Sequence, residues 1–229
     1  MWCHDRYGDY ECIYDGALMN TGFISTLQTI APWIAFLFAI TFHECAHALT
    51  AFWLGDATAK NQGRLSLNPI VHIDPIGLLC IFIFGIGWAK PVPMNQFNFR
   101  YPKFYAILCG LAGPLSNFIL ALIYLYAIKY IAAPLESITQ TAAVILYILF
   151  KSGAQMNVLL GVFNMLPIPP LDGGHIINAL IPDQWLPAYY RLTPFFIIFI
   201  LIIVSFTPFS GFLMHAMKEV LVFLDKLVI

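Results

Sequence analysis

Long apolar runs separated by short polar stretches dominate this 229-residue chain. Runs near residues 23–54, 104–133, 139–166, 190–206 and 209–224 are apolar enough to be candidate transmembrane helices, allowing a few residues at each end. The pattern predicts an all-α polytopic membrane protein. We expect a core of three transmembrane helices, followed by additional C-terminal membrane helices.

A shorter apolar run, residues 76–88, cannot cross a hydrocarbon core of ~30 Å as a helix. It is rich in glycine and is followed by Pro91 and Pro93. We therefore expect residues 76–97 to form a re-entrant or β-hairpin-like segment after the first helix, packed against protein or lining a wet cavity. The alternative is a short tilted helix, and a true span here would invert the direction of every later helix.

Composition supports the membrane assignment. Hydrophobic residues make up 60% of the chain, charged residues make up 10%, and the mean hydropathy is +0.80. A soluble domain carries about 25% charged residues. The net charge of -1 and the absence of a Lys/Arg-rich tract argue against a nucleic-acid partner, and the apolar composition makes the lipid bilayer the expected surroundings.

The distribution of charges predicts an orientation. The first 22 residues are acidic, whereas residues 55–103 hold five of the 11 Lys and Arg residues. Because such cations beside short loops stay in the cytoplasm, we expect the N-terminus outside. The expected organisation is an extracytoplasmic tail over residues 1–22, a membrane core over 23–180 and C-terminal membrane helices over 181–229. The tail lacks the features of a cleavable signal, and its Cys3 and Cys12 could be free or disulfide-bonded.

Candidate chemistry lies inside the first apolar run, in the sequence "HECAH". A strongly polar side chain at bilayer depth costs about 3 kcal/mol, so such residues are functional candidates by default. On a helix, His43 and His47 share one face and Glu44 lies beside them. Two imidazoles at this spacing can bind zinc, and a neighbouring carboxylate can take a proton from the attacking water.

A catalytic zinc site needs a third protein ligand. The stretch "FNMLPIPPLDGGHI" supplies Asp172 at the end of the run that begins near residue 139. Its prolines and glycines are also typical of a simple loop. Together with the two histidines, however, Asp172 completes a set of three ligands with one open position.

These motifs resemble the site-2 protease family of intramembrane zinc metalloproteases. "HECAH" is similar to the family's HExxH motif, "NMLPIPPLDGG" to its NxxPxPxLDG motif, and "GLAGPLSNFILAL" to the Gly-Pro-Ser-Asn element of the intervening helix. "GWAKPVPMN" and "NPIVHIDPIG" resemble the compact bacterial branch without a PDZ domain. The resemblance covers roughly residues 30–180.

The resemblance implies one Zn²⁺ per chain, held by His43, His47 and Asp172, with Glu44 as the catalytic carboxylate. Asn164 is the expected donor to the developing oxyanion, although an Asn can also join membrane helices. Asn117 is expected to pack against the catalytic helix and to support a ligand. His175 could orient a ligand or face the cytoplasmic water.

The implied function is hydrolysis of peptide bonds within transmembrane segments of membrane protein substrates, in a bacterial cytoplasmic membrane. A helical substrate would have to unwind locally, and residues 76–97 could hold the unwound stretch by β-addition. Two alternatives remain. An inactive adaptor of the same fold would not need Glu44, and a metal transporter would place ligands at several depths.

Overall fold

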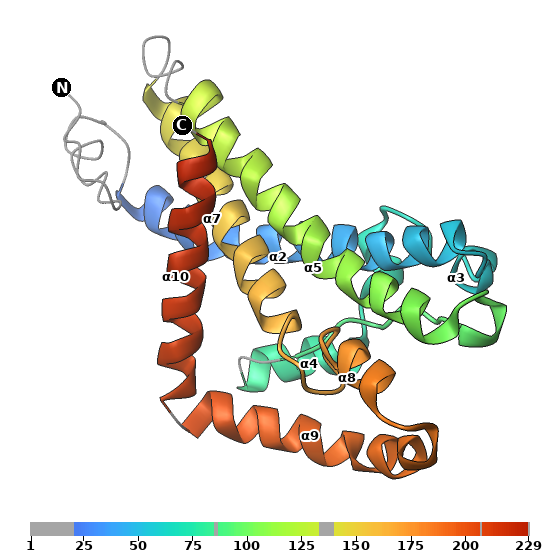
Figure 1. Cartoon of the computed structure of the whole chain (residues 1–229). Helices are drawn as coiled ribbons and strands as arrows, with labels where there is room; N and C mark the ends of the chain where they lie inside the picture. The colour runs from blue at the N-terminus through green and yellow to red at the C-terminus, as the bar shows by residue number, and fades with distance from the viewer. Residues whose placement is uncertain (1–20, 85–86, 133–139, 207, 229) are drawn as a thin grey trace.

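The computed structural model describes residues 21–84, 87–132, 140–206 and 208–228 (Figure 1). The predicted tail, with Cys3 and Cys12, lies almost entirely outside them. The described elements are helical, and their order is α2 Thr21–Trp53, α3 Thr58–Asn61, η1 Pro69–His72, α4 Pro75–Phe84, η2 Gln96–Asn98, α5 Pro102–Ala127, η3 Ile128–Ala132, α7 Gln140–Asn164, α8 Gly174–Leu180, η4 Asp183–Trp185, α9 Leu186–Phe206 and α10 Phe209–Leu227.

Three helices are long and apolar enough to cross a membrane. They cover Gly22–Trp53, Pro102–Ile131 and Thr141–Asn164, within a few residues of the first three predicted spans. The predicted core of three membrane helices is therefore confirmed at the level of length and composition. Helices α9 and α10 occupy the two C-terminal apolar runs.

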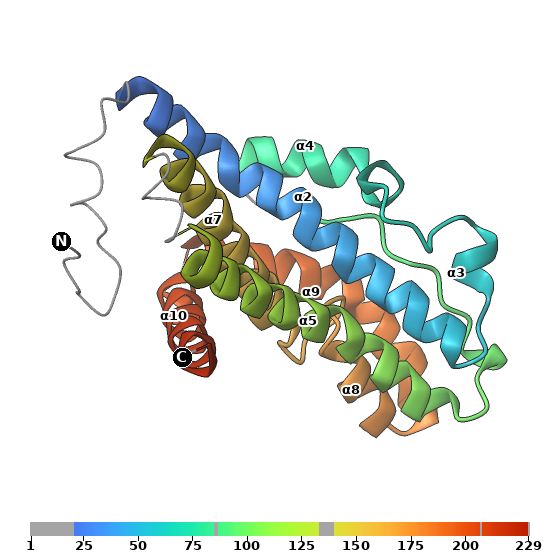
Figure 2. The ribbon, with the colours of Figure 1, turned by 90° about the horizontal axis from the view of Figure 1, so that it is seen from above.

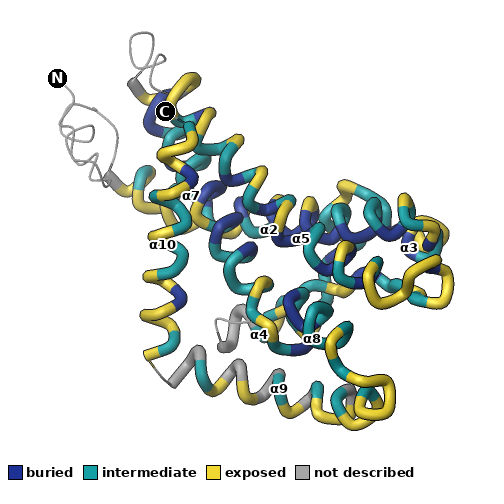
Figure 3. Tube along the Cα trace, viewed as in Figure 1, coloured by how far each residue is buried: buried dark blue, intermediate teal, exposed yellow. Residues whose placement is uncertain are grey.

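The helices α2, α5 and α7 pack against one another and contain most of the buried residues (Figures 1 and 3). Small residues make this close approach possible. On α7, a side chain at Gly153 would meet the Tyr124 ring at 2.7 Å, and one at Gly161 would meet the Phe118 ring at 2.7 Å. Aromatic rings of α5 thus lie directly over glycines of α7.

The C-terminal helices differ in how they pack. Helix α10 lies against α7 and α5, where Leu224 packs with Ala121 and Val158. Helix α9 makes its main contacts with its neighbours in the chain, η4 and α10. It runs at a steep angle to α10 along one side of the molecule (Figure 1).

The segment expected to be re-entrant or β-hairpin-like contains a short helix, the element that the sequence left as the alternative. Residues Pro75–Phe84 form helix α4, and in the described residues the only β pairing is a single antiparallel bridge between Ile73 and Ala89. Asp74 Oδ1 accepts from the backbone N–H groups of Ile76 and Gly77, at 2.9 and 2.8 Å. Asp followed by Pro is typical of a turn, but it is also an N-terminal helix signal when Pro occupies the first helical position. Leu78 of α4 lines one small cavity together with Phe36 and Leu37 of α2.

The polypeptide between α2 and α5 is organised around Asp56, which is fully buried. Its Oδ1 accepts from the Thr58 N–H at 3.0 Å and from Asn98 Nδ2 at 2.7 Å, and its Oδ2 accepts from the Asn95 N–H at 2.7 Å. Burial alone would raise the pKa of Asp56, but these hydrogen bonds outweigh it and lower the pKa below its usual range. Asp56 thus fixes residues 95–98 to the end of α2.

This arrangement predicts that Asp56→Asn destabilises the protein at pH 7 by about 1–3 kcal/mol, because the new amide would face the Asn95 N–H, donor against donor. The folded-state pKa lies below the unfolded value of about 3.9, so the carboxylate's contribution is present above pH ~4 and is lost as the pH falls further. The melting temperature in detergent should therefore fall less between pH 7 and lower pH for the variant than for the wild type.

The matched control is Asp183→Asn, because Asp183 is exposed and pairs with the exposed Lys103 at 2.6 Å. Such a pair contributes at most about 1 kcal/mol. Equal melting temperatures for Asp56→Asn and the wild type at pH 7 would show that the hydrogen bonds of Asp56 do not stabilise the segment between α2 and α5.

Candidate metal centre and active site

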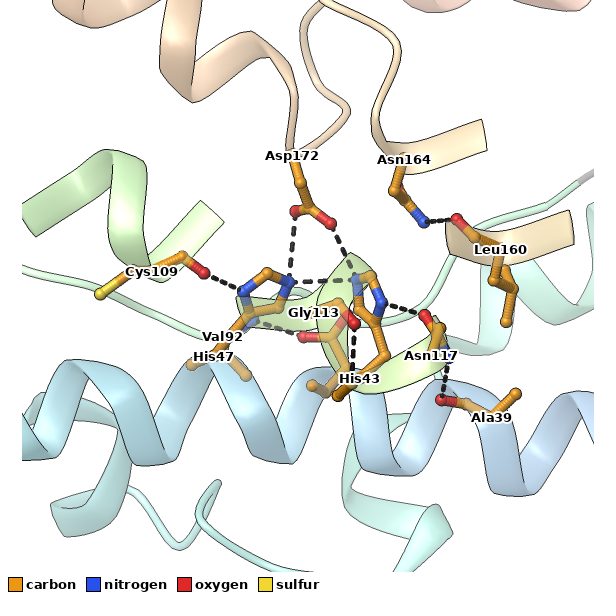
Figure 4. A network of polar contacts seen from close by, with 12 residues as sticks. Ala39, His43, His47, Val92, Cys109, Gly113, Asn117, Leu160, Asn164 and Asp172 are labelled. Atoms are coloured by element: carbon orange, nitrogen blue, oxygen red, sulfur yellow. Dashed lines mark hydrogen bonds and ion pairs between the residues drawn. The ribbon is translucent and has the colours of Figure 1, made fainter. Parts of the chain in front are cut away.

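His43 and His47 present their imidazoles side by side on α2, one turn apart (Figure 4). Both are buried, and their Nε2 atoms are 3.1 Å from each other. The rings meet edge to face, with centroids 4.6 Å apart. The spacing in "HECAH" thus produces the predicted pair of converging nitrogens.

The other nitrogen of each ring is bound to an acceptor from α5. His47 Nδ1 lies 2.6 Å from the Cys109 carbonyl oxygen, and His43 Nδ1 lies 2.6 Å from Asn117 Oδ1 (Figure 4). A carbonyl oxygen can only accept, so each Nδ1 carries the proton. A ring that is protonated at Nδ1 alone directs its Nε2 lone pair into the space between the two histidines, as metal ligation requires.

Gly113 allows α5 to approach the two rings. A side chain there would lie 2.6 Å from His43 Cε1 and would collide with His47 Nε2 as well. The following Pro114 is buried inside α5. The glycine of the "GLAGP" stretch is therefore needed at the site itself, beyond the packing role expected from the sequence.

The third predicted ligand arrives from the loop after α7. Asp172 Oδ2 is 2.9 Å from His43 Nε2, and Oδ1 is 3.2 Å from His47 Nε2 (Figure 4). The Gly173 N–H donates to the Asn164 carbonyl oxygen at 2.7 Å, which ties the loop back to the end of α7. The structure thus brings together all three residues predicted to bind metal.

This donor set fits a zinc ion. A tetrahedron with ligand bonds of ~2.0 Å has edges of about 3.3 Å, close to the measured separations of 2.9–3.2 Å. One proton could be shared between Asp172 and one imidazole, but protonating both Nε2 atoms would place two donors 3.1 Å apart. Asp172 brings one carboxylate oxygen to each histidine, so the set combines two imidazoles with one carboxylate, all of them zinc ligands.

Glu44 is buried and lies outside this ligand set. Its Oε2 accepts from the Val92 N–H at 3.1 Å. Val92 lies between Pro91 and Pro93, which have no N–H, so the sequence "PVP" offers Glu44 a single backbone donor. The predicted base is thus held by the segment between α4 and α5.

Arg64 holds that segment in place. The side chain is buried, and its guanidinium donates to the carbonyl oxygens of Val71 at 2.6 Å, of Pro91 at 3.3 Å and of Lys90. It makes no ion pair with any described residue. In the sequence, Arg64 is one of the five cations of residues 55–103, and its place within "NQGRLSLNP" gives no indication of this role.

The remaining predicted residues lie around the ligands. Asn164 Nδ2 donates to the Leu160 carbonyl oxygen at 3.1 Å within its own helix, and the catalytic role of Asn164 stays a prediction (Figure 4). His175 packs over Gly110, where a side chain would lie 2.9 Å from His175 Cβ. Burial lowers the pKa of His175, which favours a neutral imidazole. His72 bonds to the Ser66 carbonyl oxygen at 2.8 Å as a loop residue.

Comparison with known proteins agrees with this geometry. The family model "Peptidase family M50" matches residues 127–205, which include Asn164 and Asp172. "Putative zinc metalloprotease YwhC" of Bacillus subtilis (strain 168) is 38% identical over 193 residues, covering 80% of this chain and 84% of the relative. "Putative zinc metalloprotease Rip2" of Mycolicibacterium smegmatis is 32% identical over 152 residues, covering 64% of this chain and 54% of that protein.

A third relative, "Zinc metalloprotease MJ0392" of Methanocaldococcus jannaschii, is 30% identical over 86 residues, covering 38% of this chain and 23% of that protein. No solved structure matches the chain. The long match to the Bacillus relative, together with the family match over the segment that carries Asp172, establishes the family. The chain belongs to peptidase family M50, the site-2 protease family of hydrolases.

Proposed function

We propose that this protein is an intramembrane zinc metalloprotease that hydrolyses peptide bonds within transmembrane segments of other membrane proteins. The observation that carries the proposal is the convergence of His43, His47 and Asp172 in a bundle of helices apolar enough to cross a membrane. Glu44, beside the ligands in sequence and buried, is the matching acid–base group.

The residues have separate roles in this reaction. His43, His47 and Asp172 hold the zinc ion, one per chain, which when bound polarises the scissile carbonyl and makes water more acidic. Glu44 takes the proton from the attacking water and delivers it to the leaving amide nitrogen. The side-chain amide of Asn164 donates to the developing oxyanion, since one of its two N–H bonds remains beyond that used by the Leu160 carbonyl.

Substrate presentation involves the segment between α2 and α5. We place α4 as a re-entrant element, because its 10 residues rise only ~15 Å as a helix. The chain that follows runs beside α2 (Figure 2), where Val92 packs against Ala48. The β-addition hypothesis therefore narrows to residues 88–95, which would hold an unwound substrate next to Glu44. Helices α9 and α10 complete the membrane domain.

The proposed location is a bacterial cytoplasmic membrane, with the N-terminus outside and residues 55–103 on the cytoplasmic side. The active-site histidines then lie 8 to 12 residues before Gly55, ~12–18 Å from the cytoplasmic end of α2. An adaptor would not require the buried carboxylate of Glu44. The presence of both a set of metal-ligand candidates and a buried Glu44 beside them therefore favours an enzyme over an adaptor.

The metal site predicts that purified protein binds about one zinc per chain. Asp172→Ala should weaken zinc binding by more than about 100-fold, because it removes a direct ligand. Glu44→Gln should retain the metal, because Glu44 bonds to Val92 rather than lying in the ligand set, and should lower the cleavage rate by about 100-fold or more. Metal analysis after dialysis against a weak chelator, together with a cleavage assay, tests both. Full occupancy in Asp172→Ala would exclude Asp172 as a ligand.

The charge distribution predicts the topology. Single cysteines at positions 60 and 100, both exposed in the wild type, should react with a membrane-impermeant thiol reagent from the cytoplasmic side. A cysteine at position 10 should react from outside. The native cysteines are replaced beforehand, and labelling after membrane permeabilisation is the control. Labelling of positions 60 and 100 from opposite faces would show that the α4 region crosses the membrane.

The depth of the site predicts selectivity for weak substrate helices. Exposing unsatisfied backbone groups in lipid costs several kcal/mol each, so Gly, Asn or Pro near the cut should speed cleavage. Replacing these substrate residues with Leu should slow cleavage about 10-fold or more without abolishing binding, which capture by Glu44→Gln protein measures separately. Equal cleavage of Leu-substituted and native spans would show that unwinding is not limiting.

A further inference from the structure

A chain of buried amides connects α7 to the histidine pair. Asn117 on α5 and Asn157 on α7 are both fully buried. Asn117 Nδ2 donates to Asn157 Oδ1 at 2.8 Å and to the Ala39 carbonyl oxygen at 3.2 Å, while Asn117 Oδ1 accepts from His43 Nδ1. Asn157 Nδ2 in turn donates to the Gly153 carbonyl oxygen at 2.9 Å. Asn157 belongs to none of the motifs used to predict the site.

The hydrogen bonds in this chain have a defined direction. The Gly153 carbonyl can only accept, so the Asn157 amide group must face it and Asn157 Oδ1 must face Asn117. Asn117 then presents its NH₂ to Asn157 and its Oδ1 to His43. Reversing the Asn117 amide would bring its oxygen against two other oxygens and its NH₂ against the His43 N–H. The chain therefore fixes the proton of His43 on Nδ1.

Asn157 makes the shorter of the two bonds that orient Asn117. The other acceptor, Ala39, lies four residues before His43 in α2, so in a regular helix its carbonyl also receives the backbone N–H of His43. That oxygen is shared, and its bond to Asn117 is 0.4 Å longer (3.2 − 2.8 Å). Loss of Asn157 would leave Asn117 with the weaker constraint alone.

The same helix carries the third ligand. Asn157 and Asn164 are seven residues apart on α7, so they lie on nearly the same side of the helix. The carbonyl of Asn164 anchors Gly173 beside Asp172. Asn157 therefore bonds to Asn117, which holds His43, from the same helix that positions Asp172. Through Asn117 on α5 it links the histidine of α2 to the carboxylate that follows α7.

We propose that Asn157 is a positioning residue for the metal centre: acting through Asn117, it sets the orientation and the tautomer of His43. The inference rests on the proposed metal site for its consequence, which is that loss of Asn157 weakens zinc binding although Asn157 touches no ligand. Its structural part, the Nδ1–H tautomer of His43, can be measured without metal.

The test compares Asn157→Ser, Asn157→Leu and Asn157→Asp with Val158→Ala. A serine hydroxyl can bond to the carbonyl one turn earlier but is too short to reach Asn117, so this variant keeps a satisfied interior if the leucine variant fails to fold. An aspartic acid kept neutral by burial can still accept from Asn117 and donate to Gly153. Val158 is fully buried next to Asn157 and packs with Ala121 of α5 and Leu224 of α10, so Val158→Ala reports the effect of poorer packing alone.

Zinc affinity, measured by competition with a chromogenic chelator, should fall about 10-fold in Asn157→Ser and remain within about 2-fold of wild type in Asn157→Asp and Val158→Ala. In an Asn117→Leu background, Asn157→Ser should have no further effect, because its action passes through Asn117. Wild-type affinity in Asn157→Ser, or an additive loss in the double variant, would overturn the inference.

Nitrogen NMR of histidine-labelled, metal-free protein supplies the independent readout. Wild type should show the Nδ1 of His43 fully protonated, whether or not its Nε2 shares a proton with Asp172, and Asn157→Ser should show a partial loss of the Nδ1 proton. Absence of zinc binding in wild type would refute the proposed function, whereas the tautomer comparison would still decide the role of Asn157. An unchanged tautomer in Asn157→Ser would refute that role even if the wild type binds zinc.

Discussion

The structure depends on one constraint: two imidazoles placed inside an apolar helix bundle must have both nitrogens of each ring satisfied. Water does not enter lipid-facing interiors cheaply, and an unpaired buried polar group costs several kcal/mol. At Nδ1, His47 meets the constraint through the Cys109 carbonyl and His43 through Asn117, whereas both Nε2 atoms face Asp172. Both acceptors come from α5, and α5 can reach the rings only because residue 113 is glycine. The hydrogen bonds that hold the two histidines therefore require the close packing of α5 on α2.

A second set of contacts supports Glu44 independently of the ligands. Asp56 holds residues 95–98, Arg64 holds the carbonyls of Lys90 and Pro91, and Val92 between these anchors donates to Glu44. Charged side chains of both signs are buried here, and each is compensated by several hydrogen bonds rather than by a salt bridge to the other. Such groups stay ionised inside a protein when backbone and amide dipoles replace their hydration.

Prediction from the sequence was possible where chemistry imposes a fixed local spacing. His43 and His47 had to share a helical face, and Asp172 stood out as a carboxylate at the end of an apolar run. The three spanning helices followed from length alone. It failed where two signals competed: Asp74-Pro75 marks both a turn and a helix start, and the helix formed. It could not find Asn157, because one Asn in an apolar helix specifies no partner until α5 places Asn117 beside it. The roles of Arg64 and Asp56 could not be predicted for the same reason. Apart from Val71 and Thr58, their partners lie 26 or more residues away in sequence and are backbone groups or, for Asn98, a side-chain amide.

The contacts that hold His43 and those that hold Glu44 act on consecutive residues of α2 but come from different parts of the chain. His43 is held from α5 and α7, whereas Glu44 points to the segment between α4 and α5. The hydrogen bond from Val92 is a single neutral donor to a carboxylate, and Pro91 and Pro93 offer no second one. An extended substrate that displaced the Val92 N–H would free Glu44 for the attacking water while leaving every contact to the histidines intact. Because the two supports are separate, the proposed base can be exposed without loosening the proposed metal ligands.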